Sequence, residues 1–353
     1  MGSKPILTPD TSGINRLADD PDSDALVAGL RSGFHVRLTF TSVSEVIANN
    51  NRARRAQLLR ICRLLLSSGD CIDPQHEIIR KMVTRFEESL SFNWRMVRVD
   101  FPEAENEIAR EENFSDDLAE QEREEARALH NQFVKVYDDA KPAFDKLFKN
   151  GTKKTPVNVS QLVARLQMPG GAFWTLAGGL YSRVGKLPPD ETTIRKFSEG
   201  CDPFRALMIA LCAAQYDRCI RPQDVGPSLR SGRNDTLMAV CLPYCHQFVT
   251  ADPRQLACYK EVVSVAGLDV TVNSYEEFRN GFLVIGAPAG SEGSTIRKCL
   301  DAPPSGRKPQ SVKIRADNRG AFVNHLGSCS FRKASDNMAL LPGFSMRRNW
   351  GKS

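Results

Sequence analysis

Residues 234–252 have the sequence NDTLMAVCLPYCHQFVTAD. Asp235 stands at the start of an apolar run that predicts a helix as far as Cys245, and Asp252 ends the strand-like run that follows. In an open α/β sheet, strand ends and helix starts face a shared crevice at the carboxyl ends of the strands. This stretch therefore predicts an α/β fold with acidic groups in that crevice.

The N-terminal part of the chain repeats the arrangement. Asp10 follows a first apolar strand and opens a helix. Glu45 lies in a helix that follows the second strand and is expected to begin at Thr41 or Ser42. Four acids, Asp10, Glu45, Asp235 and Asp252, thus stand at equivalent places along two separated parts of the sequence.

The organisation of the whole chain follows from its periodicity. Residues 1–70 and 200–285 alternate between strand and helix patterns, which predicts one discontinuous domain with a parallel sheet. Residues 71–199 show amphipathic helical periods interrupted by Gly and Pro, which predicts a large helical insertion. Residues 286–353 are rich in Gly, Pro, Ser, Lys and Arg and are expected to form a flexible basic tail. Strands are predicted at 4–9, 35–40, 246–250 and 268–273, and helices at 10–18, 22–31, 51–68, 204–214, 235–245, 255–266 and 275–279.

The composition is that of an ordinary globular protein, with 41% hydrophobic and 25% charged residues among 353. No run reaches about 18 apolar residues and the start lacks a signal-peptide segment, so we expect a cytoplasmic protein with no membrane partner. The 10 cysteines contain no C-x-x-C pair and are expected to be free thiols. Cys241, Cys245 and His246 match no zinc spacing, and the two cysteines fit one apolar helix face better.

Charge is unevenly distributed along the chain. Between Asp100 and Arg127 there are twelve acids and three bases, whereas twelve bases and four acids follow Gly281. An acidic helix and a basic tail in one chain point to a polyanionic partner for the tail. Each segment alone is equally compatible with a solvated helix face or a flexible terminus.

The sequence around the four acids resembles that of PIN-domain nucleases. DTSGINRL at 10–17 is similar to the opening of such a domain, and so is the helix SVSEV that contains Glu45. Residues 234–252 carry the most specific resemblance, because one acid opens a helix and Thr-x-Asp ends the next strand. The resemblance covers roughly 1–70 and 200–280, and the stretch between the second and third acids is far longer than is usual in the family.

This resemblance implies a three-layer α/β/α domain and a metal-dependent endoribonuclease. Asp10, Glu45 and Asp235 are the expected core ligands of Mg²⁺ or Mn²⁺, with Asp252 on a second ion. Clustered carboxylates repel one another, which is why they usually imply a hard divalent cation. Two such ions can activate a water and stabilise the leaving oxygen of a phosphodiester.

The resemblance also implies how the substrate is held. Thr11 and Thr250 are expected to position water, metal or phosphate through their hydroxyls, and Arg230 and Arg233 to contact phosphates. Single-stranded RNA is preferred to DNA as the substrate, because most of the resembling family cuts RNA. An inhibitory protein partner and a homodimer are both left open.

Alternative interpretations exist for each residue. Asp10, Asp235 and Asp252 could each be a plain helix cap or turn residue, and Glu45 a solvated one. Asp202 rivals Asp235 as the third acid but is better explained as an N-cap before Pro203. His246 is expected to be partly buried rather than catalytic. The residues 286–295 suggest a phosphate loop but lack its Lys.

Two other functions compete with the nuclease. The first is a non-catalytic PIN-like module that binds RNA or a protein. The second is a phosphatase-type hydrolase, which would need a second Asp two residues after Asp10, where Ser12 stands instead.

Overall fold

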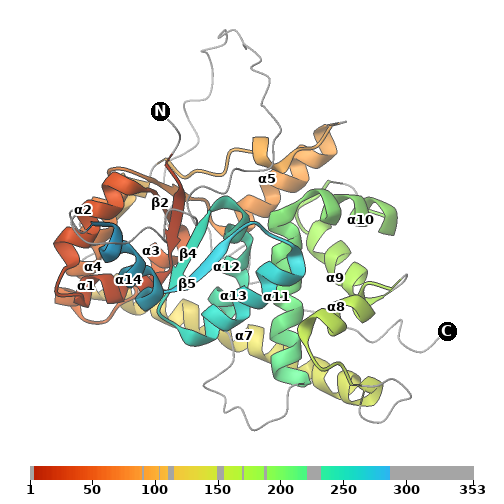
Figure 1. Cartoon of the computed structure of the whole chain (residues 1–353). Coiled ribbons are helices and arrows are strands. Elements are labelled where there is room, and N and C mark those ends of the chain that lie inside the picture. The colour runs from red at the N-terminus through yellow and green to blue at the C-terminus, as the bar shows by residue number, and fades with distance from the viewer. Residues whose placement is uncertain are drawn as a thin grey trace.

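The structure is a computed structural model that describes residues 4–89, 91–102, 104–109, 115–148, 155–168, 171–186, 189–220 and 232–286. Within these residues, five parallel strands form one sheet in the order β3-β2-β1-β4-β5. The strands are β1 (Ile6–Pro9), β2 (His35–Thr39), β3 (Asp70–Ile72), β4 (Gln247–Thr250) and β5 (Thr271–Ser274) (Figure 1). The α/β class and the parallel sheet expected from the sequence are confirmed.

The strand order fixes where the two halves of the chain meet. β1 is central, and Leu7 lies opposite Val36 of β2 on one side and Gln247 of β4 on the other. The chain builds the sheet outward from β1 to β3 and then returns to add β4 and β5 on the opposite side. Ligands of open α/β sheets bind at such a reversal, beside the carboxyl ends of the strands. Here the reversal lies between β1 and β4.

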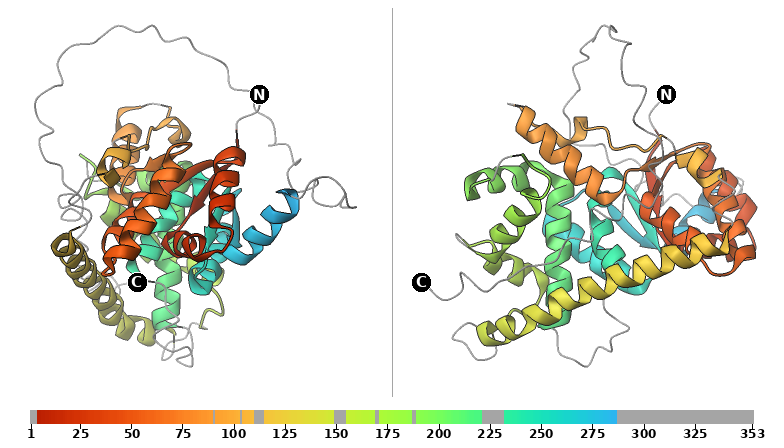
Figure 2. Two further views of the ribbon diagram at one scale, coloured as in Figure 1. Left: turned by 90° about the vertical axis from the view of Figure 1, so that its left-hand side faces the viewer. Right: turned by 180° about the vertical axis from the view of Figure 1, so that it is seen from behind.

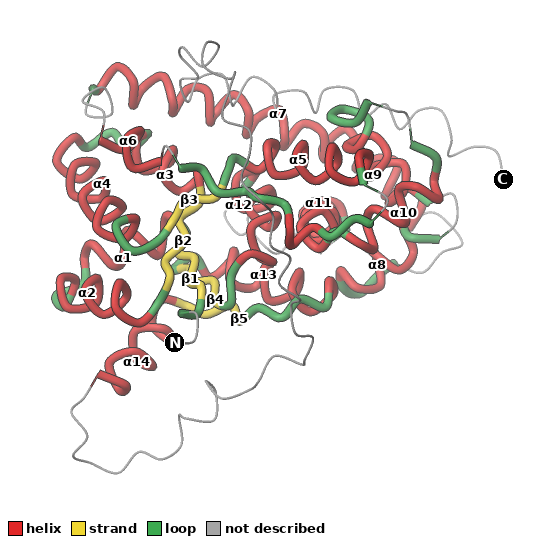
Figure 3. The backbone as a smooth tube through the Cα atoms, turned by 90° about the horizontal axis from the view of Figure 1, so that it is seen from above, coloured by secondary structure: helices red, strands yellow, loops and turns green. Residues whose placement is uncertain are grey.

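Alternation along the strands divides the apolar core in two. Phe248 of β4 packs into one cluster and the next residue, Val249, into the other. In β3, Cys71 and Ile72 divide in the same way, because successive side chains of a strand point to opposite faces. Helices therefore cover both faces of the sheet (Figure 3).

One face is covered by helices from both ends of the sequence. Leu58, Leu59 and Leu65 of α4 are fully buried there, next to Leu7 and Val36 of the sheet. The helices on this face are α1 (Thr11–Asp19), α2 (Ser23–Gly33), α3 (Phe40–Ile47), α4 (Arg52–Leu66), α6 (Ala104–Ala109) and α14 (Tyr275–Gly286).

The other face is built around α11 (Asp202–Cys219), whose side chains are buried almost all round. Phe204 contacts Phe197 of the preceding helix, so the helical segment and the second half of the sheet share one continuous core. The remaining elements of this core are α5 (Gln75–Glu88), η1 (Trp94–Met96), α8 (Val159–Leu166), α9 (Ala172–Tyr181), α10 (Glu191–Gly200), α12 (Arg233–Met238), η4 (Ala239–Tyr244) and α13 (Pro253–Ala266).

Helix α7 (Asp116–Phe148) runs across the molecule and links the two cores (Figure 2). Near its start, Asp116 forms an ion pair with the fully buried Arg55 of α4 at 2.7 Å. Farther along, Phe133 and Tyr137 are buried in the core around α11. The second half of the acidic segment, from Asp116 to Arg127, thus belongs to the N-terminal half of a helix that contacts both cores.

The structure differs from the sequence prediction in several elements. Strand β3 was not predicted, and it straddles the expected boundary between residues 70 and 71. The helix with Glu45 begins earlier than expected, because Thr39 caps it by accepting a hydrogen bond from the Ser42 amide at 3.0 Å. The expected helix 235–245 is divided into α12 and the 3-10 helix η4, which contains Pro243. Helix α14 extends to Gly286 rather than ending at Arg279, and the expected tail lies outside the described residues.

Candidate carboxylate site at the carboxyl edge of the sheet

Asp10 is the residue that joins β1 to α1. It is 3% exposed and caps α1, since its Oδ1 accepts a hydrogen bond from the Gly13 amide at 2.6 Å. Ser12 donates to the same carboxylate, and the Thr250 hydroxyl lies 2.8 Å from its Oδ2. Gly13 has no room for a side chain, because a Cβ would lie 3.0 Å from the Val249 carbonyl oxygen. The cap prediction for Asp10 is therefore correct, and it coexists with a contact to the neighbouring strand.

Ser12 ties the ends of β1 and β4 together. Its hydroxyl oxygen accepts hydrogen bonds from the backbone amides of Ala251 at 2.7 Å and Asp252 at 3.0 Å. The Thr250 hydroxyl also contacts Gln255, which is almost fully buried. The sequence analysis did not single out Ser12 or Gln255 as site residues. The Asp-Thr-Ser-Gly order at a strand end was the available signal for Ser12.

Glu45 extends the site toward β2. It projects from α3, and both of its carboxylate oxygens are engaged. Thr11 donates to Oε2, and the side-chain amide of Asn234 donates to Oε1 at 2.7 Å. Asn234 stands next to Asp235, so this hydrogen bond connects the acid of the first half to the acid of the second half. Asn234 was also missed, because its partner lies 189 positions away in the sequence.

Asp235 and Asp252 each accept a hydrogen bond from a backbone amide at the start of a helix. The Oδ2 of Asp235 accepts from the Gly232 amide at 2.8 Å, and its carbonyl accepts from the buried Tyr259 hydroxyl at 2.6 Å. Asp252 caps α13 by accepting from the Arg254 amide at 2.8 Å, and it is partly exposed. Three of the four acids, Asp10, Asp235 and Asp252, thus each accept a backbone hydrogen bond at a helix start.

The four acids interact electrostatically in a row. Burial raises the pKa of Asp10 to about 7 against hydrogen bonds that lower it, and the charge of Glu45 adds to the rise. Burial also raises the pKa of Glu45, with a further rise caused by Asp235. The pKa of Asp235 is raised by burial and then by Asp252. Glu45 therefore disfavours ionisation of Asp10, Asp235 that of Glu45, and Asp252 that of Asp235.

This donor set suits a hard divalent cation, which would offset the repulsion among buried carboxylates. In the described ranges, however, no three His, Cys, Asp or Glu side chains are arranged as metal ligands. The oxygens of Asp10 and Glu45 are directed instead to hydroxyl and amide donors. The acids form a coupled row with the chemistry of a metal site but without a preformed coordination shell.

The other residues singled out from the sequence fall in different places. Thr11 and Thr250 belong to the site, and Arg233 lies at the start of α12 beside Asn234. Arg230 lies outside the described residues. Asp202 is not an N-cap as expected; Cys201 occupies that position, and Asp202 pairs with Arg205 at 2.6 Å.

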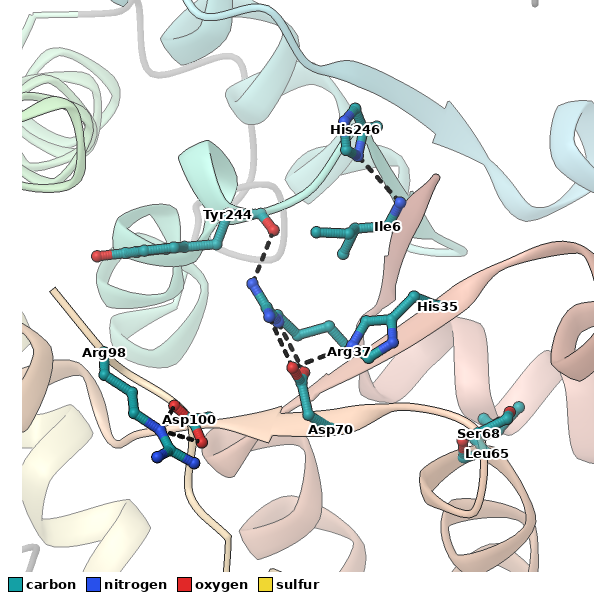
Figure 4. A network of polar contacts seen from close by, with 10 residues as sticks. All are labelled: Ile6, His35, Arg37, Leu65, Ser68, Asp70, Arg98, Asp100, Tyr244 and His246. Carbon is teal, nitrogen blue, oxygen red and sulfur yellow. Dashed lines mark hydrogen bonds and ion pairs between the residues drawn. The ribbon is translucent and has the colours of Figure 1, made fainter. Parts of the chain in front are cut away.

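A cleft of about 930 Å³ lies at the opposite, amino edge of the sheet and is lined by Asp202 and His246. Its floor is a closed polar network, in which Asp70 accepts two hydrogen bonds from Arg37 and pairs with His35 at 3.0 Å (Figure 4). His246 is exposed rather than partly buried, and its Nδ1 accepts from the Ile6 amide at 2.9 Å. Because these charges satisfy one another, we place the candidate site at the carboxyl edge instead.

The cysteines in the described part of the chain are all free and buried, which confirms that expectation for eight of them. Cys299 and Cys329 lie outside the described residues. Among the helices that the structure describes, none has the length and apolar character needed to cross a membrane.

Comparison with known proteins adds no relative to this description. No protein-family model matches the chain, and neither a curated protein nor a solved structure is significantly similar to it.

Proposed function

We propose that this chain is a PIN-like, divalent-metal-dependent endoribonuclease. The observation that supports this best is the row of Asp10, Glu45, Asp235 and Asp252 at the point where the strand order reverses. Asp10 is buried and the other three acids are partly buried. Acids that repel one another with little access to solvent lower the stability of the apo protein, and such groups cluster at functional sites. Within the described residues, none of the four forms an ion pair with Lys or Arg that would explain the burial.

In this proposal, Asp10, Glu45 and Asp235 hold the first cation and Asp252 the second. Mg²⁺ or Mn²⁺ supplies an activated water and offsets the charge on the phosphate. Thr250 and Ser12 keep the Asp10 carboxylate in place, and Thr11 does the same for Glu45. The Asp10 carboxylate also faces the first amides of α1, and helix N-termini favour negative charge.

The substrate and setting are part of the same proposal. Single-stranded RNA fits the resemblance in residues 1–70 and 200–280, and the PIN-like assignment rests on the four acids standing in the family's order. Eight buried free thiols are compatible with a reducing compartment such as the cytoplasm. The proposed partners include an inhibitory protein or a second copy of the chain, and binding assays with the full-length protein would test for either.

The test is a cleavage assay with purified full-length protein and single-stranded RNA. We expect cleavage with Mg²⁺ or Mn²⁺ and none with EDTA. Asp10→Asn should remove nearly all activity, because the amide keeps the size of the side chain but not the charge that holds the cation. The matched control is Asp202→Asn at the opposite edge of the sheet, which should leave turnover nearly unchanged.

Two outcomes would change the assignment. If Asp202→Asn abolished cleavage while Asp235→Asn did not, the choice of the third acid would be wrong. If no divalent ion supported cleavage of RNA or DNA although RNA was still bound, the non-catalytic binding module would replace the nuclease.

A further inference from the structure

Three basic residues lie on α12, which carries Asp235, and on the two helices α11 and α7 that pack against it. Arg233 lies on α12, Arg218 in the last turn of α11, and His130 on α7. The three helices pack against one another, and α7 also contacts α3, which carries Glu45 (Figure 3). Only His130, on α7, comes from outside residues 1–70 and 200–285, in which the sequence located the site.

The face of α7 that meets this region is defined by ring contacts. His130, Phe133 and Tyr137 are spaced by three and four residues, so they share one helix face. The guanidinium carbon of Arg218 lies 5.7 Å from the ring centroids of both Phe133 and Tyr137. His130 is the exposed end of this face, and the two rings hold Arg218 next to it.

The charges of this group affect one another. The pKa of His130 is lowered by burial and then by Arg218 and Arg233, whereas Asp235 raises it. The pKa of Arg233 is lowered by burial and raised by Glu125 of α7, which offsets part of its charge. His76 of α5 is also affected by Arg233. Its pKa is lowered first by burial and then by the charges of Arg80 and Arg233. The two guanidinium groups are suited to an anion, and His130, whose lowered pKa favours the neutral ring, can still donate one N–H.

We propose that Arg233, Arg218 and His130 form a subsite for a backbone phosphate of single-stranded RNA, next to the carboxylate row. The subsite rests on the proposed function for its place in catalysis, but its binding chemistry is separate. Forked guanidinium groups match phosphate oxygens, and His130 adds an N–H donor at the solvent-exposed rim. The helices that carry these three residues would thereby determine which nucleotides of the RNA lie over the carboxylate row.

The test measures binding apart from cleavage. A fluorescein-labelled, ten-nucleotide single-stranded RNA is titrated with full-length protein in EDTA, and anisotropy is followed over a salt series. Arg233→Gln should weaken binding about tenfold, as expected for loss of a charged hydrogen bond. His130→Ala should weaken it about threefold, and loss of the Arg233 charge should lower the salt slope by roughly 0.7.

The controls separate charge from folding. Arg85→Ala removes an exposed arginine of α5 that lines a different, small cleft, and it should keep parental affinity. Arg233→Lys keeps the charge without the fork and should bind between the parent and Arg233→Gln. The variants must have the same melting temperature as the parent protein. If the Arg233 variants unfold, His130→Ala alone tests the subsite.

Parental affinity and salt slope in His130→Ala and Arg233→Gln, or absence of RNA binding by the parent, would overturn the subsite. A parent that binds RNA through this group but cuts nothing would remove the nuclease proposal and leave the subsite. A parent that cuts RNA while both variants bind RNA normally would remove the subsite and leave the nuclease proposal.

Discussion

At the scale of single residues, Asp10 offers a direct test of whether the site opposes stability. Burial raises the pKa of its carboxyl to about 7 in the folded protein, whereas the ordinary value of 3.8 applies to the unfolded chain. Between these values the folded protein binds more protons, so stability falls as the pH rises from about 4 to 7. The shift corresponds to roughly 4 kcal/mol, and the loss is complete above pH 7.

We therefore expect Asp10→Asn to raise the melting temperature in EDTA at pH 8 by a few degrees and to gain nothing at pH 4. The amide can accept hydrogen bonds at only one atom, which reduces the gain. Asp202→Asn serves as the charge control in the same thermal scans. A loss of stability at pH 8 would mean that Asp10 acts mainly as a helix cap.

At the scale of elements, α14 docks on α2 through a packed aromatic group. Phe34, Phe278 and Phe282 form ring contacts at centroid distances near 6 Å, and Phe282 lies directly over Gly29. A Cβ at Gly29 would come within 2.4 Å of that ring, whereas one at Gly33 on the same helix would meet nothing within 4 Å. Arg279 and Tyr275 strengthen the docking through Asp20.

Gly33→Ala should be neutral or stabilising, because Ala favours the helix by up to about 1 kcal/mol. Gly29→Ala gains the same helix preference but displaces Phe282, so it should be less stable than Gly33→Ala by roughly 1–3 kcal/mol. Urea denaturation measures the difference in unfolding free energy between the two variants. Hydrogen exchange in residues 275–282 should increase only in Gly29→Ala. Equal stabilities would show that α14 is not held at this contact.

The elements also show what the sequence could and could not predict. Long periodic helices such as α4 and α13 were located within a few residues, because their apolar spacing is a local signal. Strand β3 was missed because three residues are too few to display a period. Asp10 and Asp252 were found since each ends an apolar strand, but Asn234 and Ser12 depend on partners 189 and about 240 positions away. No local pattern encodes the contact of Asn234, whereas the Asp-Thr-Ser-Gly order at a strand end was the available signal for Ser12.

At the scale of the whole molecule, the helical segment and the second half of the sheet share one core. Phe197, Phe204 and Tyr181 pack together, and Phe248 of β4 belongs to the same cluster. Helices α5, α8, α9 and α10 thus share the core on one face of the sheet, whereas α6 of the same stretch packs on the other face, and no separate sheet occurs among the described residues of 73–199. This arrangement predicts a single cooperative unfolding transition.

The measurement is urea unfolding of a Trp350→Phe variant, which leaves Trp94 and Trp174 as the fluorescent reporters. Both lie in the core around α11. Their transition should coincide with that of far-UV circular dichroism, which reports on all helices. Two separated midpoints would show that the helical segment unfolds as an independent unit.

The pairing of β1 with β4 has a consequence for the protein during its synthesis. Asp10 is made early, but Thr250, which contacts it, follows 240 residues later. At about 5–20 residues per second, a ribosome needs roughly 12–48 s to cover that interval. For most of this time the nascent chain carries Asp10 and Glu45 without Asp235, Asp252 or β4. A polypeptide still attached to the ribosome would therefore have no assembled carboxylate row, and under the proposed function the messenger beside it would be spared until nearly all of the sheet is complete.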